Sequence, residues 1–502
     1  MKTLHKYANN ILTIMIILIL SGNLACNRQA GKSSLKGADF LWTTSSEEAL
    51  AKLNKGLLLL DAGDIISSRE YFTKAIERDP EFAIAYSFRA LSSGSTDEFV
   101  SDIESAVSFS KKISDFEKTL IQINETYINS DSDKRLELAQ HLINKYPEHP
   151  RALLYYGYVL QERNNLKEAR EAFSKAKEIS PGWLGSYVAL GTSYAFYKPT
   201  DFEMSRNLFS EATHLHPKIA YLHVNLGDAY RALDKLESAS DEYSQAIELD
   251  PENWVAYAKK GHVNSFLGKY KEARSNYQEA RKHMTYGNQS YIMEALTYLY
   301  EGDPDKCIIW LEDKAEGIDK LAIKSSRRKT GKLYCSNACA LIAFHHNKPE
   351  HFSKAKLIRN ELNTQISAVA NTPGVKRDAK AENIFWDGLE AALACDYETA
   401  LAKAEENKEI LSESKDPNKL YNYEFLLGYI KYKQEKYTES VDHFKMGDPN
   451  WVYNQYYLAK AYQANNQDEK ANPIYREVAT FNFNDVGFAL VRDEVRRIVA
   501  AL

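Results

Sequence analysis

Cysteine and histidine are the residue types of this chain best suited to redox or metal chemistry. After the first cysteine, the remaining four are Cys307, Cys335, Cys339 and Cys395. Cys335 and Cys339 are four residues apart, which places them on one helix face in a poor geometry for a bond to each other, although either could pair with Cys307. A metal site completed by His345 and His346 would match no standard zinc spacing. We therefore expect buried packing thiols, with a disulfide to Cys307 as the open alternative and a metal site as the least favoured one.

Sequence motifs of catalysis are missing from the chain. Lys329–Lys332 reads Lys-Thr-Gly-Lys, but it lacks the preceding glycine and strand of a phosphate-binding loop. The chain has neither a Gly-x-Ser-x-Gly elbow nor a His-Glu-x-x-His pair. Its many carboxylates fall on helix faces that we expect to be solvated. We therefore expect a protein that is not an enzyme and that uses no cofactor.

The remaining candidates are residues that could bind a ligand without reacting with it. In chain order they are Tyr158, Gln161, Thr192, Asp228, Arg231 and His262. An aromatic ring, an amide, a hydroxyl, an acid and two bases in one row would suit noncovalent binding of a protein or peptide. The competing interpretation is that Asp228 and Arg231, three residues apart, simply pair on a solvated helix face, which is worth about 0.2–0.5 kcal/mol.

Helices must position these six candidates, because the candidates occur at regular positions within a repeated pattern of small and aromatic residues. Two stretches have the same offsets, namely Gly157, Ala169, Phe173, Ala176 and Pro181, and Gly227, Ala239, Tyr243, Ala246 and Pro251. In each stretch the glycine and the first alanine are twelve residues apart, so they fall on two helices that can pack closely in antiparallel. The aromatic residue four positions later fills the remaining space. The prolines suit the first position of the next helix.

This pattern, with its period of about 34 residues, resembles the tetratricopeptide repeat. The resemblance implies an all-α fold, an α-solenoid of helix–turn–helix repeats wound into a right-handed superhelix, with a concave groove lined by the first helix of each unit. The six candidate residues would then face the groove. Family members that clamp the C-terminal carboxylate of chaperones use Lys and Asn at set positions. Here Asn225 alone matches, because Val188 and Thr192 stand where Lys and Asn are needed, so we expect a different partner.

The same pattern divides the chain into segments. We expect a signal peptide over 1–25, a flexible tether over 26–46, an N-terminal solenoid over 47–316, an irregular helical connection over 317–380, a C-terminal repeat block over 381–484 and a capping helix over 485–502. The connection contains a basic stretch, Gly317–Lys332. We interpret this stretch as a solvated helix end or loop rather than as a patch for an anionic partner.

The N-terminus has the features of an export signal. Positive charges at Lys2 and Lys6 precede an apolar run, Ile11–Leu20, which is too short to span a bilayer as a mature helix. The ending Leu24-Ala25-Cys26 resembles a bacterial lipobox, which implies lipid attachment at Cys26. We therefore expect a lipid-anchored protein of the bacterial cell envelope, either periplasmic or at the outer membrane.

The net charge of the chain and the positions of its tryptophans indicate which classes of partner are favoured. The formal net charge is -5, so no overall positive charge favours nucleic acid. The leading hypothesis is a membrane-anchored extracytoplasmic scaffold that binds a protein or peptide through its concave groove. The alternative is a glycan-binding outer-membrane lipoprotein built on the same repeats, since such proteins carry Trp-bearing insertions. Trp183, Trp254 and Trp451 instead lie at repeat starts, where packing explains them.

Overall fold

The computed structural model describes residues 42–284, 289–321, 323–370 and 372–502, and all regular elements within these ranges are helices. The first half contains α2 Glu47–Ala62, α3 Ile65–Arg78, α4 Ala83–Leu91, α5 Thr96–Phe109, the short η1 Ser110–Lys112, α6 Asp115–Asn129, α7 Ser132–Lys145, α8 Pro150–Glu162, α9 Leu166–Ile179, α10 Leu184–Phe196, α11 Phe202–Leu215, α12 Ala220–Ala232 and α13 Leu236–Leu249. The second half contains α14 Trp254–Phe266, α15 Tyr270–His283, α16 Gln289–Tyr300, α17 Pro304–Ile318, α18 Ser325–His345, α19 Pro349–Ala370, α20 Pro373–Leu393, α21 Tyr397–Ile410, α22 Tyr421–Lys433, α23 Tyr437–Met446, α24 Val452–Ala464, α25 Asp468–Ala479 and α26 Val486–Ala500. The expected signal peptide, Cys26 and most of the expected tether lie outside the described residues. None of the described helices is both long and apolar enough to cross a bilayer.

The helices follow one another in pairs, each made of an inner first helix and an outer second helix. Small residues let the two helices of a pair approach closely, and Ala169, Ala239 and Ala273 are completely buried. A Cβ atom on Gly227 would lie 2.5 Å from the ring of Tyr243, so only glycine fits at this contact. The pairs stack on their neighbours along the chain. The all-α solenoid predicted from the sequence is confirmed.

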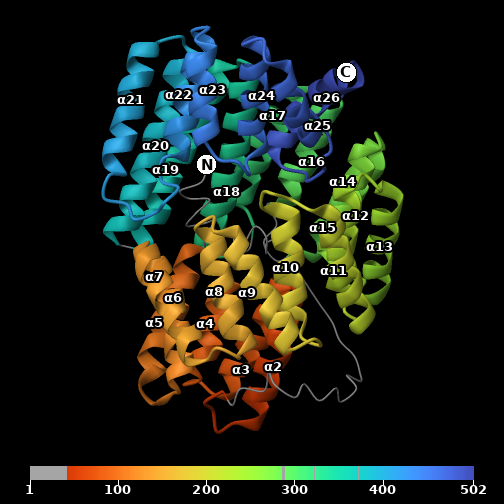
Figure 1. Cartoon of the computed structure of the whole chain (residues 1–502), viewed down its shortest axis with the longest axis vertical. Helices are drawn as coiled ribbons and strands as arrows, with labels where there is room; N and C mark the ends of the chain where they lie inside the picture. Colours follow the sequence, from red (N-terminus) through yellow and green to blue (C-terminus); the bar gives the residue numbers. More distant parts are fainter. Residues whose placement is uncertain (1–41, 285–288, 322, 371) are drawn as a thin grey trace.

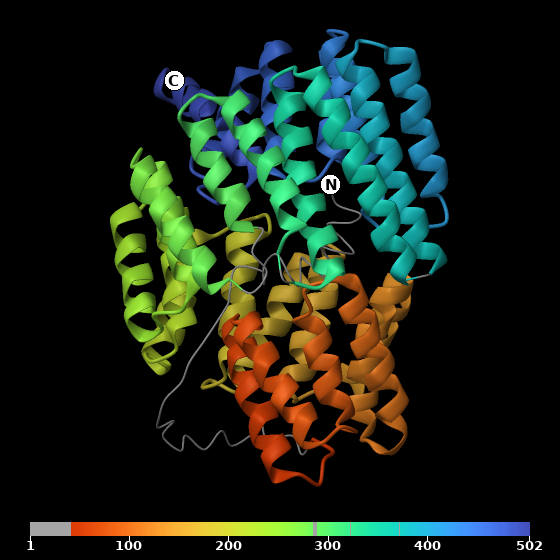
Figure 2. The same cartoon turned by 180° about the vertical axis from the view of Figure 1, so that it is seen from behind.

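The solenoid curls into a body with two tiers (Figure 1 and Figure 2). In Figure 1, α2–α9 lie in the lower half, α17–α26 lie in the upper half, and α11–α15 run along one side. At the N-terminal end the curvature brings α2 against α10, although α3–α9 separate them in the chain. The inner helices of the first pairs therefore surround an interior space rather than an open groove.

The connection expected over 317–380 consists of helices that join the two tiers. It includes α18 and α19, which pack on each other, and the start of α20. Arg327 and Lys324 of its basic stretch pair with Glu98 of α5 at 2.9 and 3.1 Å. Burial alone would raise the pKa of Glu98, but the hydrogen bond and charge of Arg327 and the charge of Arg69 hold it at about 2. Interpreting the stretch as solvated is wrong for Arg327, whose side chain is 16% exposed because it contacts the other tier.

Three of the cysteines lie in the core of the C-terminal tier. Cys307 of α17 and Cys335 and Cys339 of α18 are buried and unpaired, while Cys395 is exposed in the turn after α20. Burial raises the pKa of Cys335 to about 12, so it stays a neutral thiol. The structure agrees with packing thiols and not with a disulfide to Cys307.

Candidate functional site

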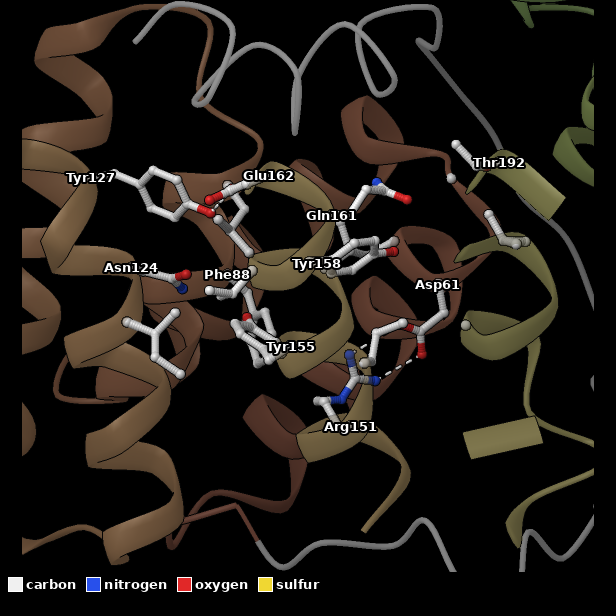
Figure 3. Close-up of a pocket in the computed structure, with 18 of the residues that line it drawn as sticks. Asp61, Phe88, Asn124, Tyr127, Arg151, Tyr155, Tyr158, Gln161, Glu162 and Thr192 are labelled. Carbon is white, nitrogen blue, oxygen red and sulfur yellow. Dashed lines mark hydrogen bonds and ion pairs between the residues drawn. The ribbon is translucent and has the colours of Figure 1, made fainter. Parts of the chain in front are cut away.

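A cavity lies on the inner face of the N-terminal repeats, and we call it the N-terminal pocket (Figure 3). Its cavity volume is about 110 Å³, and part of the surrounding space is open to solvent. Its walls come from the inner helices of six successive pairs, α2, α4, α6, α8, α10 and α12. The aromatic residues that line it are Phe88, Tyr127, Tyr155, Tyr158, Tyr197 and Tyr221. The pocket is therefore the stretch of the predicted groove that the solenoid curvature turns into a cavity.

Asp61, at the end of α2, closes the pocket on one side. Its carboxylate accepts two hydrogen bonds from the guanidinium of Arg151 on α8, at 3.0 and 2.7 Å, and one from the indole of Trp183 at 2.7 Å. Asn225 of α12 donates to the carbonyl of Ala62 at 3.0 Å. A buried carboxylate needs such partners, because removing its charge from water costs free energy unless hydrogen bonds or an opposite charge compensate it. These contacts tie α2 to α8, α12 and the start of α10.

Glu162, at the end of α8, forms a second polar wall (Figure 3). Its carboxylate accepts hydrogen bonds from the hydroxyl of Tyr127 and, at 2.9 Å, from the guanidinium of Arg135. The same guanidinium lies 3.6 Å from the centre of the Tyr127 ring. Burial, followed by the charge of Glu162, raises the pKa of Tyr127, so its hydroxyl remains a donor at neutral pH. Both carboxylates that line the pocket are thus paired already.

Three of the predicted binding residues, Tyr158, Gln161 and Thr192, lie at this pocket (Figure 3). Tyr158 and Gln161 are one turn apart on α8, and Thr192 is on α10. Gln161 is 6% exposed and Thr192 is 9% exposed. The ring of Tyr158 packs edge-on against Phe173, with centroids 5.3 Å apart. Their role in binding stays a prediction.

The other three predicted residues, Asp228, Arg231 and His262, belong to a buried polar network in the following repeats. Arg231 donates to Asp228 at 2.8 Å and to Nδ1 of His262 at 2.7 Å, and Lys259 reaches Asp228 at 2.7 Å. Burial, and then the charges of Arg231 and Lys259, lowers the pKa of His262 far below its usual value, so its neutral ring can accept. The expected solvent-facing placement is wrong for Arg231 and His262, which are 1% and 2% exposed.

A segment from the C-terminal tier explains this burial. Asn482 donates to the carbonyl of Arg231 at 3.2 Å and to Asp234 at 2.7 Å. The guanidinium of Arg231 lies 5.4 Å from the centre of the Phe483 ring, which also packs on Phe196 at 4.5 Å. Residues 482 and 483 thus cover the ends of the inner helices α10 and α12, although Asn482 lies 251 residues beyond Arg231 in the chain.

Sequence patterns missed the polar residues that shape the pocket. Asp61 and Arg151 are 90 residues apart, and Tyr127 and Glu162 are 35 residues apart. The second separation is close to one repeat period, but the pattern of small and aromatic residues marks neither pair. The only local signal was their place at the ends of inner helices, which is shared by many residues of the chain.

The tryptophans at repeat starts lie where packing accounts for them. Trp183 and Trp254 are 6% and 1% exposed. Trp451 packs on Phe425 with ring centroids 4.7 Å apart. These rings do not form an exposed platform of the kind on which a sugar could stack.

Models of one repeat family match several parts of the chain. A model described as TPR repeat matches residues 227–265, and two described as tetratricopeptide repeat match residues 136–182 and residues 49–82 and 255–280. The matched ranges fall on α2 and α3, on α7–α9 and on α12–α15. They therefore coincide with the helix pairs whose small and aromatic residues keep the same offsets.

Known proteins with similar sequences match part of the chain. Hsp70-Hsp90 organizing protein 3 of Arabidopsis thaliana is 23% identical over 247 residues, which cover 47% of this chain and 42% of its own length. Tetratricopeptide repeat protein 6 of Homo sapiens is 28% identical over 120 residues, which cover 24% of this chain and 23% of its own length. The chain thus spans less than half the length of these relatives.

Solved structures with similar folds cover between about a third and nine tenths of the chain. The APC/C hetero-tetramer Cut9-Hcn1 contains a chain that is 15% identical, with a TM-score of 0.41 and coverage of 89% of this chain and 76% of that chain. Yeast Tom70 is also 15% identical, with a TM-score of 0.41 and coverage of 86% and 90%. A thermophilic TPR protein of Thermus thermophilus is 20% identical, with a TM-score of 0.33 and coverage of 37% and 99%.

Proposed function

The chain is a tetratricopeptide-repeat protein, and from this premise we propose that it is a membrane-anchored extracytoplasmic scaffold that binds a protein or peptide through the N-terminal pocket. The observation that carries the proposal is the convergence of inner helices from six successive pairs on one aromatic cavity. Binding sites are usually concave, largely preformed and apolar, with a few polar groups that orient the ligand. One relative is named Hsp70-Hsp90 organizing protein 3, which is in keeping with a role in holding partner proteins.

A polypeptide suits the pocket better than a glycan. Its two carboxylates, Asp61 and Glu162, already have partners within the protein. A sugar brings many hydroxyl groups, and each of them loses free energy when it leaves water without a new hydrogen bond. Side chains of a peptide bring apolar surface with few polar atoms, which matches an aromatic lining.

Membrane attachment is the part of the proposal that rests on the sequence alone. The motif that ends at Cys26 resembles a lipobox, and α2 begins at Glu47. The polar residues between them would hold the repeats away from the bilayer surface. This arrangement would leave the pocket accessible to a partner in the cell envelope.

Filling the pocket tests the binding function. Val188 lies on α10, is half-buried and lines the pocket. We expect Val188→Phe in the full tagged chain to occupy the space a ligand needs and to reduce partner recovery from native membranes at least ten-fold. Thermal unfolding of the variant should stay within a few degrees of the parent, because the added ring enters an existing cavity.

A substitution of the same size on the outer surface provides the control. Leu249 ends the outer helix α13 and is 38% exposed, so Leu249→Phe should leave recovery unchanged. If Val188→Phe folds and recovers the partner as well as the parent does, the pocket is not the binding site.

A further inference from the structure

Gln161 has a buried oxygen whose hydrogen-bonding capacity is unused. Its side chain lines the N-terminal pocket and is 6% exposed. The amide group hydrogen-bonds Tyr197, but Oε1 has no partner among the described residues. A buried acceptor without a donor costs about 1–3 kcal/mol, so proteins rarely leave one without a reason.

Comparison with other repeats of the same chain explains the missing donor. Gln463 occupies the equivalent position on α24, and its Oε1 accepts a hydrogen bond from the hydroxyl of Tyr475 on α25 at 3.0 Å. Ser265 of α14 is equivalent too, and it lies 3.2 Å from the hydroxyl of Tyr277 on α15. In both repeats, the polar residue meets a tyrosine on the outer helix of its own pair.

The pair α8 and α9 departs from this arrangement at a single atom. Phe173 stands at the position of Tyr475 and Tyr277, sixteen residues after the small residue of the inner helix. Its ring contacts the Gly157 position just as the Tyr277 ring contacts Gly261. Phenylalanine lacks the hydroxyl, so the donor that satisfies the equivalent residue elsewhere is absent beside the pocket.

The charges around the pocket restrict what can enter. Asp61 is paired with Arg151, and Glu162 is paired with Arg135 and Tyr127. A charged ligand group would leave water without a free counter-charge, which is strongly unfavourable. The ligand group must therefore be uncharged, must suit aromatic walls and must bring a hydrogen-bond donor.

Among protein side chains, tryptophan and tyrosine meet these three requirements together. We propose that the N-terminal pocket takes a tryptophan or tyrosine side chain from a partner polypeptide, and that Gln161 Oε1 accepts a hydrogen bond from its indole N–H or phenol O–H. The inference rests on the proposed function and adds to it the identity of the anchoring side chain.

Blocked peptides that differ in one atom test this hydrogen bond. The probes are acetyl-Ser-Trp-Ser-amide, the same peptide with benzothienylalanine, whose ring has the shape of indole with sulfur in place of N–H, and the same peptide with aspartate. Calorimetric titration of the full chain should show the Trp peptide binding about five-fold more tightly than the benzothienylalanine peptide. The aspartate peptide should not bind.

Two variants should abolish the difference in affinity between the Trp and benzothienylalanine peptides, each in a different way. Gln161→Leu deletes the acceptor, and Phe173→Tyr supplies an internal donor in the position that Tyr475 has beside Gln463. Both variants should bind the Trp and benzothienylalanine peptides equally. The matched control Gln463→Leu, which alters the equivalent position in the C-terminal tier, should keep the five-fold ratio. Thermal unfolding of each variant verifies that it is folded.

The outcomes separate this inference from the proposed function. Three results would overturn the proposed hydrogen bond from an aromatic side chain. The parent could bind the Trp and benzothienylalanine peptides equally, folded Gln161→Leu or Phe173→Tyr could keep the five-fold ratio of affinities, or the Trp peptide could fail to bind. In each of these cases the proposed function stands if Val188→Phe still abolishes partner recovery. The proposed function fails if Val188→Phe recovers the partner normally, whatever the peptides do.

Discussion

At the scale of single residues, the contact between a small residue and an aromatic ring holds each helix pair together. Gly227 of α12 faces the ring of Tyr243 on α13, and Gly157 faces Phe173 in the same way. Tyr243 is completely buried, so its ring has no free space to move into. The equal offsets of these residues made the contacts predictable, because they depend on spacing within about 20 residues of the chain.

Adding one methyl group at this contact should destabilise the protein. In Gly227→Ala the new Cβ would lie 2.5 Å from the Tyr243 ring, which overpacks the pair and should lower the free energy of unfolding by about 1–3 kcal/mol. Gly317, in the last turn of α17, has no atom within 4 Å of an added Cβ. Gly317→Ala should therefore be neutral or stabilise by up to about 1 kcal/mol. Urea unfolding measures both, and an equal effect of the two substitutions would contradict the packing account.

At the scale of helices, the structure brings together elements that the sequence pattern treats as distant. The turn between α2 and α3 packs on α12, where a Cβ at Gly63 would lie 2.8 Å from the ring of Tyr221. The same contact places Asp64 near Asp250 in the turn between α13 and α14, since the charge of Asp64 raises the pKa of Asp250. The sequence revealed the turns themselves but not that curvature joins them, because no local spacing encodes the angle between successive pairs.

This closure should make stability depend on pH. Burial and then the charge of Asp64 raise the pKa of Asp250 to about 7, compared with the usual 3.8. Between these values the folded protein keeps the proton while the unfolded chain loses it. The stabilising contribution is thus complete below about pH 4 and is lost as pH rises to about 7. Asp250→Asn cannot ionise, so its free energy of unfolding should fall less than that of the parent over this interval.

An exposed aspartate with the opposite shift serves as the control for this measurement. Asp396 caps α21, and its hydrogen bonds with Thr399 lower its pKa. The contribution of Asp396 changes only as pH falls below about 4, so Asp396→Asn should run parallel to the parent at higher pH, whereas Asp250→Asn should not. Denaturant unfolding of both variants between pH 4 and pH 8 gives the comparison. Parallel curves for Asp250→Asn and the parent would show that Asp250 ionises normally in the folded protein.

At the scale of the whole molecule, the two tiers decide which predicted groove residues remain available. Tyr158, Gln161 and Thr192 line the N-terminal pocket, whereas Arg231 is buried against Asn482 and Phe483, and His262 is buried beside Arg231. Repeat offsets correctly identified inner-helix positions in all these cases. They could not show that the C-terminal tier covers the later positions, because that contact joins residues 251 apart in the chain.

Attachment to a membrane is a property of the whole protein that depends on one residue outside the described ranges. If Cys26 carries the lipid, Cys26→Ser should move the full chain from the membrane fraction to the soluble fraction of the cell envelope. Loss of the acyl chain should be visible by mass spectrometry of the N-terminal peptide. Identical partition of variant and parent, with no acyl chain on either, would remove the anchor from the proposal.

Photocrosslinking from within the pocket tests the central claim that the N-terminal pocket binds the partner. Tyr197 lines the pocket and is half-buried, so p-azidophenylalanine at this position keeps the ring and replaces only the hydroxyl by a small photoreactive azide. Tyr462 of α24 is also half-buried but lies in the other tier, and the same replacement there serves as the control. Irradiation with the recovered partner should give an adduct from position 197 and none from position 462. An adduct from position 462 alone, or equal adducts from both positions, would contradict the account.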